Sequence, residues 1–279
     1  MNNVIMSEKV VYKDHKVNNR MVCDVIKEFT EPKKILIVFW HGLGDLLMFA
    51  PLYNLMCQMF PVHQFDLSVL PGVGQCDIVK GALELPEENF VKDHDTAFVM
   101  SFPMVEGAAT MTKMEYCCIA ELGIAPVYTG LPTVNTPYNR LVGVHFQGTC
   151  LPGSTNPDDK LAKTMWDDLV EAGYVPIDLH FEHIFHNPVN KKFDWATRNC
   201  RDLQPDIDTL RMLIGRCVAF IGVASGPFVL AASMKKNRTI YLQKNHTIDC
   251  YIKDFTNVID INNYSKDTML KMLSDMEND

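Results

Sequence analysis

The sequence predicts an α/β protein built from two doubly wound, Rossmann-like domains. Short apolar runs alternate with segments of helical periodicity, and the runs at 35–40 and 141–146 each begin one series of such units. Continuous apolar strands of this kind are typical of parallel sheets that are buried on both faces. Prolines and glycines cluster at 126–137, between the two series, which indicates a linker. We therefore expect an N-terminal domain at 1–135, a C-terminal domain at 136–279, and a ligand-binding cleft between them.

The N-terminal half is expected to open with a short hairpin or helix and to continue as a βαβ series. Its first strand is followed by a glycine-containing turn, and Asp45 is expected to cap the helix that comes next. Gly123 suits the C-terminal end of the second helix. The expected strands are 35–40, 65–70 and 97–102, and the expected helices are 46–60 and 113–122.

The C-terminal half repeats this alternation of strands and helices. A polar loop at 147–159 separates its first strand from its first helix, and Gly173 suits the end of that helix. The expected strands are 141–146, 175–179, 218–222 and 239–242, and the expected helices are 160–171, 207–217, 225–234 and 266–277.

Composition and charge narrow the class of protein. The formal net charge is -8 and no dense basic run occurs, whereas proteins that bind nucleic-acid phosphates usually carry a basic surface. The nine cysteines form no C-x-x-C pair, so we expect buried, reduced thiols and a cytoplasmic protein. Residues 1–30 show no secretory signal, and no run approaches the roughly 18 apolar residues of a membrane span.

The first candidate site is the turn that holds His41, Gly42, Gly44 and Asp45. It follows a predicted strand, and open α/β sheets bind ligands at the carboxyl ends of their strands. Glycines let the backbone approach a ligand closely, and a carboxylate there has the chemistry of a general base. A structural role as a helix cap explains the aspartate equally well. Leu47 stands where a G-x-G-x-x-G dinucleotide fingerprint would need glycine.

A second candidate site is Ser225, Gly226 and Pro227, which also follow a predicted strand. A serine cap, a glycine and a first-turn proline leave helix N–H groups open to a phosphate, although the same residues suit an ordinary capped helix. Gln147 and Gly148 begin the polar loop that ends at Lys160. A lysine there has the charge to neutralise phosphate, or it is simply solvated.

The remaining polar clusters carry less information. His180, Glu182, His183 and His186 have a conceivable zinc spacing, but the segment lacks helical periodicity and a companion ligand motif, which favours surface or packed histidines. The sequence contains neither a Walker loop nor a G-x-S-x-G elbow. P-loop enzymes and serine hydrolases of that type are therefore disfavoured.

Three segments, in this order and spacing, resemble the heptosyltransferase-like family 9 of glycosyltransferases. Residues 34–52 are similar to the family's opening strand, Gly-Asp turn and helix with a Pro-Leu step. Residues 142–148 are similar to the strand and loop that begin its second domain. Residues 221–232 are similar to its Ser/Thr-Gly-Pro helix start, which continues to Leu-Ala-Ala.

This resemblance implies a GT-B fold and an inverting, metal-independent transfer of a sugar from a nucleotide-diphosphate donor, with no other cofactor. It implies that Asp45 is the base that activates the acceptor hydroxyl, and that His41, Gly42 and Gly44 form the acceptor-side loop. On the donor side it implies a site formed by Gln147, Gly148, Lys160, Ser225, Gly226 and Pro227.

The sequence departs from the family at two donor-side positions. Ala224 stands where the family has an acidic residue, and Val229 stands where it has a histidine. A degenerate nucleotide-binding protein without transfer activity is therefore an alternative interpretation. A different doubly wound enzyme, such as a nucleotide-sugar epimerase, is a third. The acceptor is expected to be a glycan or a hydroxymethylated base of phage DNA.

Overall fold

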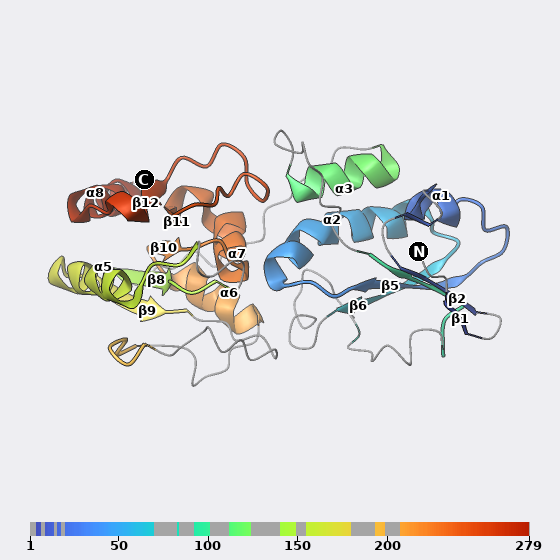
Figure 1. Cartoon of the computed structure of the whole chain (residues 1–279), viewed down its shortest axis with the longest axis horizontal. Helices are drawn as coiled ribbons and strands as arrows, with labels where there is room; N and C mark the ends of the chain where they lie inside the picture. The colour runs from blue at the N-terminus through green and yellow to red at the C-terminus, as the bar shows by residue number, and fades with distance from the viewer. Residues whose placement is uncertain are drawn as a thin grey trace. The chain divides into compact units, whose positions relative to one another are not determined.

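The chain divides into two compact units, Met1–Tyr128 and Thr129–Asp279. The structure is a computed structural model that describes residues 4–6, 9–13, 16–17, 20–69, 83, 92–100, 112–123, 140–148, 155–179, 193–198 and 207–278. The expected linker and the boundary at 135/136 lie outside the described residues. Each unit contains a five-stranded sheet (Figure 1).

The sheet of the first unit has the order β1-β2-β7-β5-β6. Its strands pair in parallel except β1 and β2, which form an antiparallel hairpin. The central strand β5 is buried along its apolar run, as a strand covered on both faces should be. The strands are β1 (Val4–Met6), β2 (Lys9–Lys13), β5 (Lys34–Phe39), β6 (Gln64–Val69) and β7 (Thr96–Val99).

Helices α2 (Leu43–Met59) and α3 (Lys113–Leu122) pack against each other, on the same side of this sheet as α1 (Val22–Ile26) (Figure 1). α2 begins earlier than expected. Its N-cap is Gly42, and the prediction that Asp45 caps the helix is wrong. Asp45 lies inside the first turn because Gly44, buried and without a bulky side chain, is already helical.

The sheet of the second unit has the order β12-β11-β10-β8-β9, and all its strands are parallel. The four strands expected here are present, and β12 is an additional edge strand that was too short to predict from periodicity. The strands are β8 (Leu141–His145), β9 (Val175–Asp178), β10 (Ala219–Gly222), β11 (Thr239–Gln243) and β12 (Val258–Asp260).

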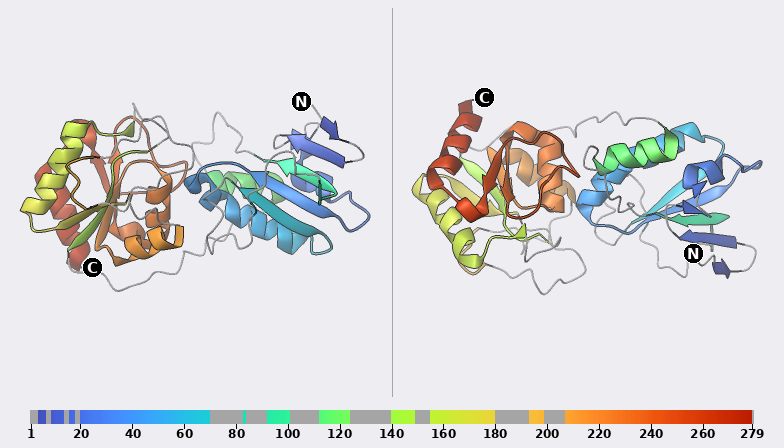
Figure 2. Two further views of the ribbon diagram at one scale, coloured as in Figure 1. Left: turned by 90° about the horizontal axis from the view of Figure 1, so that it is seen from below. Right: turned by 45° about the horizontal axis from the view of Figure 1, so that its top comes forward.

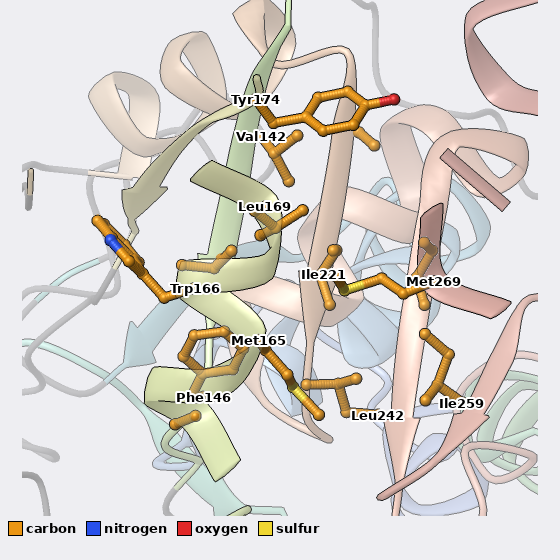
Figure 3. Close-up of a cluster of buried hydrophobic side chains, with 14 of the residues drawn as sticks. Val142, Phe146, Met165, Trp166, Leu169, Tyr174, Ile221, Leu242, Ile259 and Met269 are labelled. Atoms are coloured by element: carbon orange, nitrogen blue, oxygen red, sulfur yellow. The ribbon is translucent and has the colours of Figure 1, made fainter. Parts of the chain in front are cut away.

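Helices cover both faces of this second sheet. α5 and α8 lie on one face, and α6 and α7 lie on the other (Figure 2). Met165 and Leu169 of α5 and Met269 of α8 pack on the strands around Ile221 and Leu242, which Figure 3 shows in close-up. The helices are α5 (Asp159–Glu171), α6 (Ile207–Arg216), α7 (Gly226–Lys235) and α8 (Lys266–Asn278).

Polar contacts fix α8 on α5. The Tyr264 hydroxyl donates to Asp168 Oδ2 at 2.9 Å, and Lys266 Nζ lies 2.6 Å from Glu171 Oε2 and 3.4 Å from Asp168 Oδ1. Burial, together with this carboxylate, raises the pKa of Tyr264 above its ordinary value, so the phenol stays a donor. The final helix therefore closes the core of the second unit.

Candidate functional site

The carboxyl edge of the second sheet contains a topological switch point. In chain order its strands are β8, β9, β10, β11 and β12, and β8 lies between the second and third of them. The connections from β8 and β10 therefore leave in opposite directions, and doubly wound sheets bind ligands at the carboxyl ends of two such strands. His145 pairs with Gly222 at that end of the ladder. The donor-side segments predicted from sequence follow these two strands directly.

The start of α7 forms one wall of this switch point. Ser225 is the N-cap, in extended conformation, and its Oγ accepts the Phe228 N–H at 3.3 Å. Pro227 has no N–H group to satisfy and suits the first turn. The Gly226 N–H is then the helical donor nearest the end of β10, where the helix dipole favours an anion. The structure thus confirms the predicted cap and places all three residues at the sheet edge.

Gly148 forms the opposite wall and lies tightly against the turn before Ser225. A β-carbon at Gly148 would lie 2.6 Å from the Ala224 carbonyl oxygen and 3.3 Å from Val223 Cγ2. Only glycine allows this approach of the two loops. Gln147, the other predicted residue of this loop, is partly exposed beside it.

Asn156 holds the Gly148 loop by both ends of its amide. Asn156 Oδ1 accepts the Gly148 N–H at 2.9 Å, and its Nδ2 donates to the Gly148 carbonyl oxygen at 3.1 Å. Lys244, which follows β11, donates from Nζ to the Asn156 carbonyl oxygen at 3.3 Å. Neither residue was singled out from sequence: Lys244 contacts a residue 88 positions away, and the contact of Asn156 with Gly148 depends on how the loop between them folds back.

Lys160, the basic residue expected from sequence, is the second residue of α5 and is exposed. Its helix is capped by Asp158, whose Oδ1 accepts the Leu161 N–H at 2.7 Å. Within the part of the chain that the structure describes, the Lys160 ammonium contacts none of the donor-side residues. Lys244, by contrast, contacts this loop through the carbonyl oxygen of Asn156.

The first unit places a charged pair at the carboxyl end of β5. Asp45 Oδ1 lies 2.5 Å from Lys113 Nζ, and the two side chains are 22% and 28% exposed. Asp45 Oδ2 lies 4.0 Å from His41 Nδ1. His41 in turn packs on the ring of Phe39, with centroids 4.5 Å apart. The sequence predicted the carboxylate here but not its ammonium partner, which is 68 residues away.

A capping box fixes the position of Lys113. Glu115 Oε2 accepts the Thr112 N–H at 2.7 Å, and Thr112 Oγ1 accepts the Glu115 N–H at 3.2 Å. This reciprocal pair defines the first turn of α3, in which Lys113 is the first residue. The T-x-x-E spacing is the sequence signal for this helix start, although it does not reveal the ion pair.

The three residues expected to form the acceptor-side loop do not all lie in a loop. His41 and Gly42 lie in the connection between β5 and α2, and nothing lies within 4 Å of a β-carbon built on Gly42. Gly44 is part of the helix rather than of the turn.

The described residues contain no group of three histidine, cysteine or acidic side chains able to hold a metal ion. The cluster of His180, Glu182, His183 and His186 lies outside those residues. No helix in the described ranges is long and apolar enough to cross a membrane. Burial raises the pKa of the thiols of Cys118 and Cys217, to about 11 and about 12.

Two Rossmann-like α/β units, each with a candidate polar site at the carboxyl edge of a largely parallel sheet, define the class of this protein. No family model matches the sequence. No curated protein matches it either. Solved structures match most of the chain, and they confirm the predicted GT-B architecture, which is that of heptosyltransferases and family 9 glycosyltransferases.

Escherichia coli heptosyltransferase WaaC, solved with ADP, has a TM-score of 0.57 at 11% identity, over 87% of this chain and 99% of that one. The family 9 glycosyltransferase of Veillonella parvula has a TM-score of 0.53 at 12% identity, over 88% and 97%. The dodecameric, iron-containing heptosyltransferase TibC, solved with ADP-D-beta-D-heptose, has a TM-score of 0.52 at 16% identity, over 82% of this chain. This chain spans 63% of the length of that TibC chain.

Proposed function

We propose that this protein is a glycosyltransferase that moves a sugar from a nucleoside-diphosphate donor to an acceptor hydroxyl. The observation that carries the proposal is the switch point of the second sheet, where the start of α7 faces a loop that only glycine can form. The crevice at such a point is where doubly wound sheets bind nucleotides. The similarity of the fold to structures solved with ADP and ADP-heptose supports this choice of ligand.

The second unit supplies the donor site in this proposal. The Gly226 N–H and the dipole of α7 bind the diphosphate, with Ser225 and Pro227 fixing the turn. Gln147 and Gly148 line the opposite side, and Lys160 neutralises phosphate charge from the start of α5. Because backbone donors and a lysine stabilise the leaving group, the proposed reaction requires no metal ion.

The first unit supplies the base. In a single displacement the acceptor oxygen forms a bond to the anomeric carbon while the bond from that carbon to the diphosphate oxygen breaks. The acceptor proton passes to Asp45, and the nucleoside diphosphate leaves with the electron pair. One displacement of this kind inverts the anomeric centre. His41, 4.0 Å from Asp45 Oδ2, is positioned for one acceptor oxygen to bond both groups at about 2.8 Å.

The acceptor in this proposal is a hydroxyl of a glycan, or less favourably that of a hydroxymethylated base in phage DNA. The net charge of -8 opposes a DNA acceptor, because phosphate contacts are made by lysine and arginine. Transfer assays with both acceptor classes, each in the presence of EDTA, test the acceptor and the metal independence together.

The decisive experiment compares Asp45→Asn with the wild type. We expect transfer to fall by at least 100-fold, while the affinity for nucleotide donor, measured by calorimetry, stays unchanged. Asp24→Asn is the matched control, since Asp24 also pairs with a lysine in the first unit, at an exposed site. Full activity of Asp45→Asn, or equal loss of transfer and donor binding, would contradict the assigned role.

A second candidate function is nucleotide binding without transfer. Ala224 and Val229 replace polar family residues and are 2% and 1% exposed, so both positions belong to the packed core. A protein of this kind would bind nucleotide sugars in a thermal-shift screen and leave them intact. Release of nucleoside diphosphate only when an acceptor is present would exclude it, and release of a free epimer would indicate an epimerase.

A further inference from the structure

We infer that Lys113 is a positioning residue for the proposed base: its ammonium holds Asp45 Oδ1 and thereby orients the carboxylate for the acceptor hydroxyl. The inference rests on the proposed function, because it gives Asp45 the role of base. The sequence analysis placed the base and the residues around it in the single turn after β5, and the inference adds a residue from α3.

The contact between Lys113 and Asp45 is close. Lys113 Nζ lies 2.5 Å from Asp45 Oδ1, whereas Oδ2 of the same carboxylate lies 4.0 Å from His41 Nδ1. The first distance is that of a charge-assisted hydrogen bond, and the second is too long for any hydrogen bond. A carboxylate that an ammonium holds at one oxygen is restricted in its orientation. Lys113 therefore limits how the proposed base can present itself to the acceptor hydroxyl.

Neither helix needs this pair for its own stability. A lysine at the first position of α3 lies at the positive end of the helix dipole, where a cation is unfavourable, and the capping box already satisfies that end. Asp45 is favourable in the first turn of α2 without any partner. The structure therefore places Lys113 against the preference of its own helix, at the point where it contacts the proposed base.

The backbone of both partners is well fixed. α2 and α3 pack along each other, and Met114 and Cys118 of α3 are buried. The reciprocal bonds of Thr112 and Glu115 set the first turn of α3, so the Lys113 backbone has little freedom. A side chain anchored on packed elements orients a catalytic group more precisely than one on a loop.

The test measures steady-state transfer and donor affinity for Lys113→Met and Lys113→Arg. For Lys113→Met we expect kcat to fall by about 10- to 100-fold, with the Kd for nucleoside diphosphate unchanged. Lys113→Arg should keep most of the wild-type kcat, because arginine retains the positive charge and the hydrogen-bond donors. Lys163→Met is the control: it removes an ion pair of the same 2.5 Å length on the exposed side of α5 and should leave kcat at the wild-type value.

A purely structural role is separated from positioning by a second measurement. If Lys113 acts through Asp45, then adding Lys113→Met to Asp45→Asn should cause no further loss of kcat. The inference would be overturned if Lys113→Met lowered kcat by the same factor in the Asp45→Asn background as in the wild type. It would also be overturned if Lys113→Met alone left kcat unchanged. Lys113→Gln is the substitute if the methionine variant does not fold, since Gln keeps a donor at the capped helix start.

Failure of the proposed function is distinguishable from failure of this inference. If the wild type transfers no sugar, the proposed function fails, whatever the variants do. The pair is then tested by the unfolding free energies of Asp45→Asn, Lys113→Met and the double variant. Additive effects would show that the two side chains are not coupled and would reject the positioning role independently of activity.

Discussion

Gly148 and Ala224 approach so closely that a single methyl group would separate them. A β-carbon on Gly148 would lie 2.6 Å from the Ala224 carbonyl oxygen, a distance that real β-carbons do not show. The contact joins the loop after β8 to the loop after β10, which are the two walls of the switch point. The shape of the proposed donor site therefore depends on the absence of a side chain at one position.

Gly148→Ala is expected to weaken nucleotide binding strongly while the protein still folds. The added methyl group meets backbone rather than a flexible side chain, so the loops must separate, at a cost of about 1–3 kcal/mol in unfolding free energy. Binding of nucleoside diphosphate should fall at least 10-fold when measured by calorimetry. Gly42→Ala is the control, because nothing lies within 4 Å of its β-carbon. Unchanged binding in Gly148→Ala would show that the ligand does not use this edge.

Asn156→Asp tests the amide that holds the Gly148 loop. Aspartate keeps the acceptor for the Gly148 N–H but places a second oxygen against the Gly148 carbonyl oxygen, where the native side chain donates. Loss of that donor should reduce the unfolding free energy by about 1–3 kcal/mol, measured in urea. Asn237, on the exposed turn after α7, offers a control substitution. Equal stability of Asn156→Asp and wild type would contradict the described hydrogen bonds.

Ser225→Asp separates helix capping from anion binding. Aspartate is as good an N-cap as serine, so the midpoint of thermal unfolding should stay within about 2 °C of the wild type. Its charge occupies the place proposed for the donor phosphate, and affinity for nucleoside diphosphate should fall at least 100-fold by repulsion. Ser225→Ala should behave oppositely, losing about 1 kcal/mol of stability with a smaller loss of affinity. Retained binding in Ser225→Asp would place the anion elsewhere.

The buried thiols predict a loss of stability at high pH. Burial raises the pKa of Cys118 to about 11 and that of Cys217 to about 12 from an ordinary value of 9.0. Between pH 9 and its folded-state pKa, each thiol is protonated in the folded protein and ionised in the unfolded chain. The stability is therefore complete below pH 9 and falls by about 1.4 kcal/mol per pH unit for each thiol, from pH 9 to about 11 for Cys118 and to about 12 for Cys217.

Cys217→Ala isolates one of these titrations. Its unfolding free energy should fall less steeply above pH 9 than that of the wild type, by the slope of one proton, when both are measured by urea unfolding. Lys235 acts in the opposite sense, because burial lowers its pKa, and it is present in both proteins. An identical slope for the variant and the wild type would show that Cys217 does not titrate in this way.

Much of the fold follows from local pattern. The run at 35–40 was predicted as a strand because consecutive apolar residues indicate burial on both faces. The segment after Ser225 was predicted as a helix because serine is a favoured N-cap residue. β12 was not predicted, and the N-terminal hairpin was predicted only as an alternative to a helix, because strands of three to five residues show too little periodicity. The start of α2 was placed too late, since glycine at position 44 is a weak helix former that tertiary packing accommodates.

The sequence by itself determined the two α/β units, the serine cap of α7, and the presence of a carboxylate and a glycine turn after β5. These depend on neighbouring residues, whose chemistry acts over one turn or one strand. Only the tertiary structure decided that Lys113 pairs with Asp45, that Asn156 holds Gly148, and that Lys244 rather than Lys160 contacts that loop. The contacts of Lys113 and Lys244 join segments brought together by strand order and helix packing, whereas that of Asn156 depends on the path of a single loop. No spacing along the chain encodes these contacts.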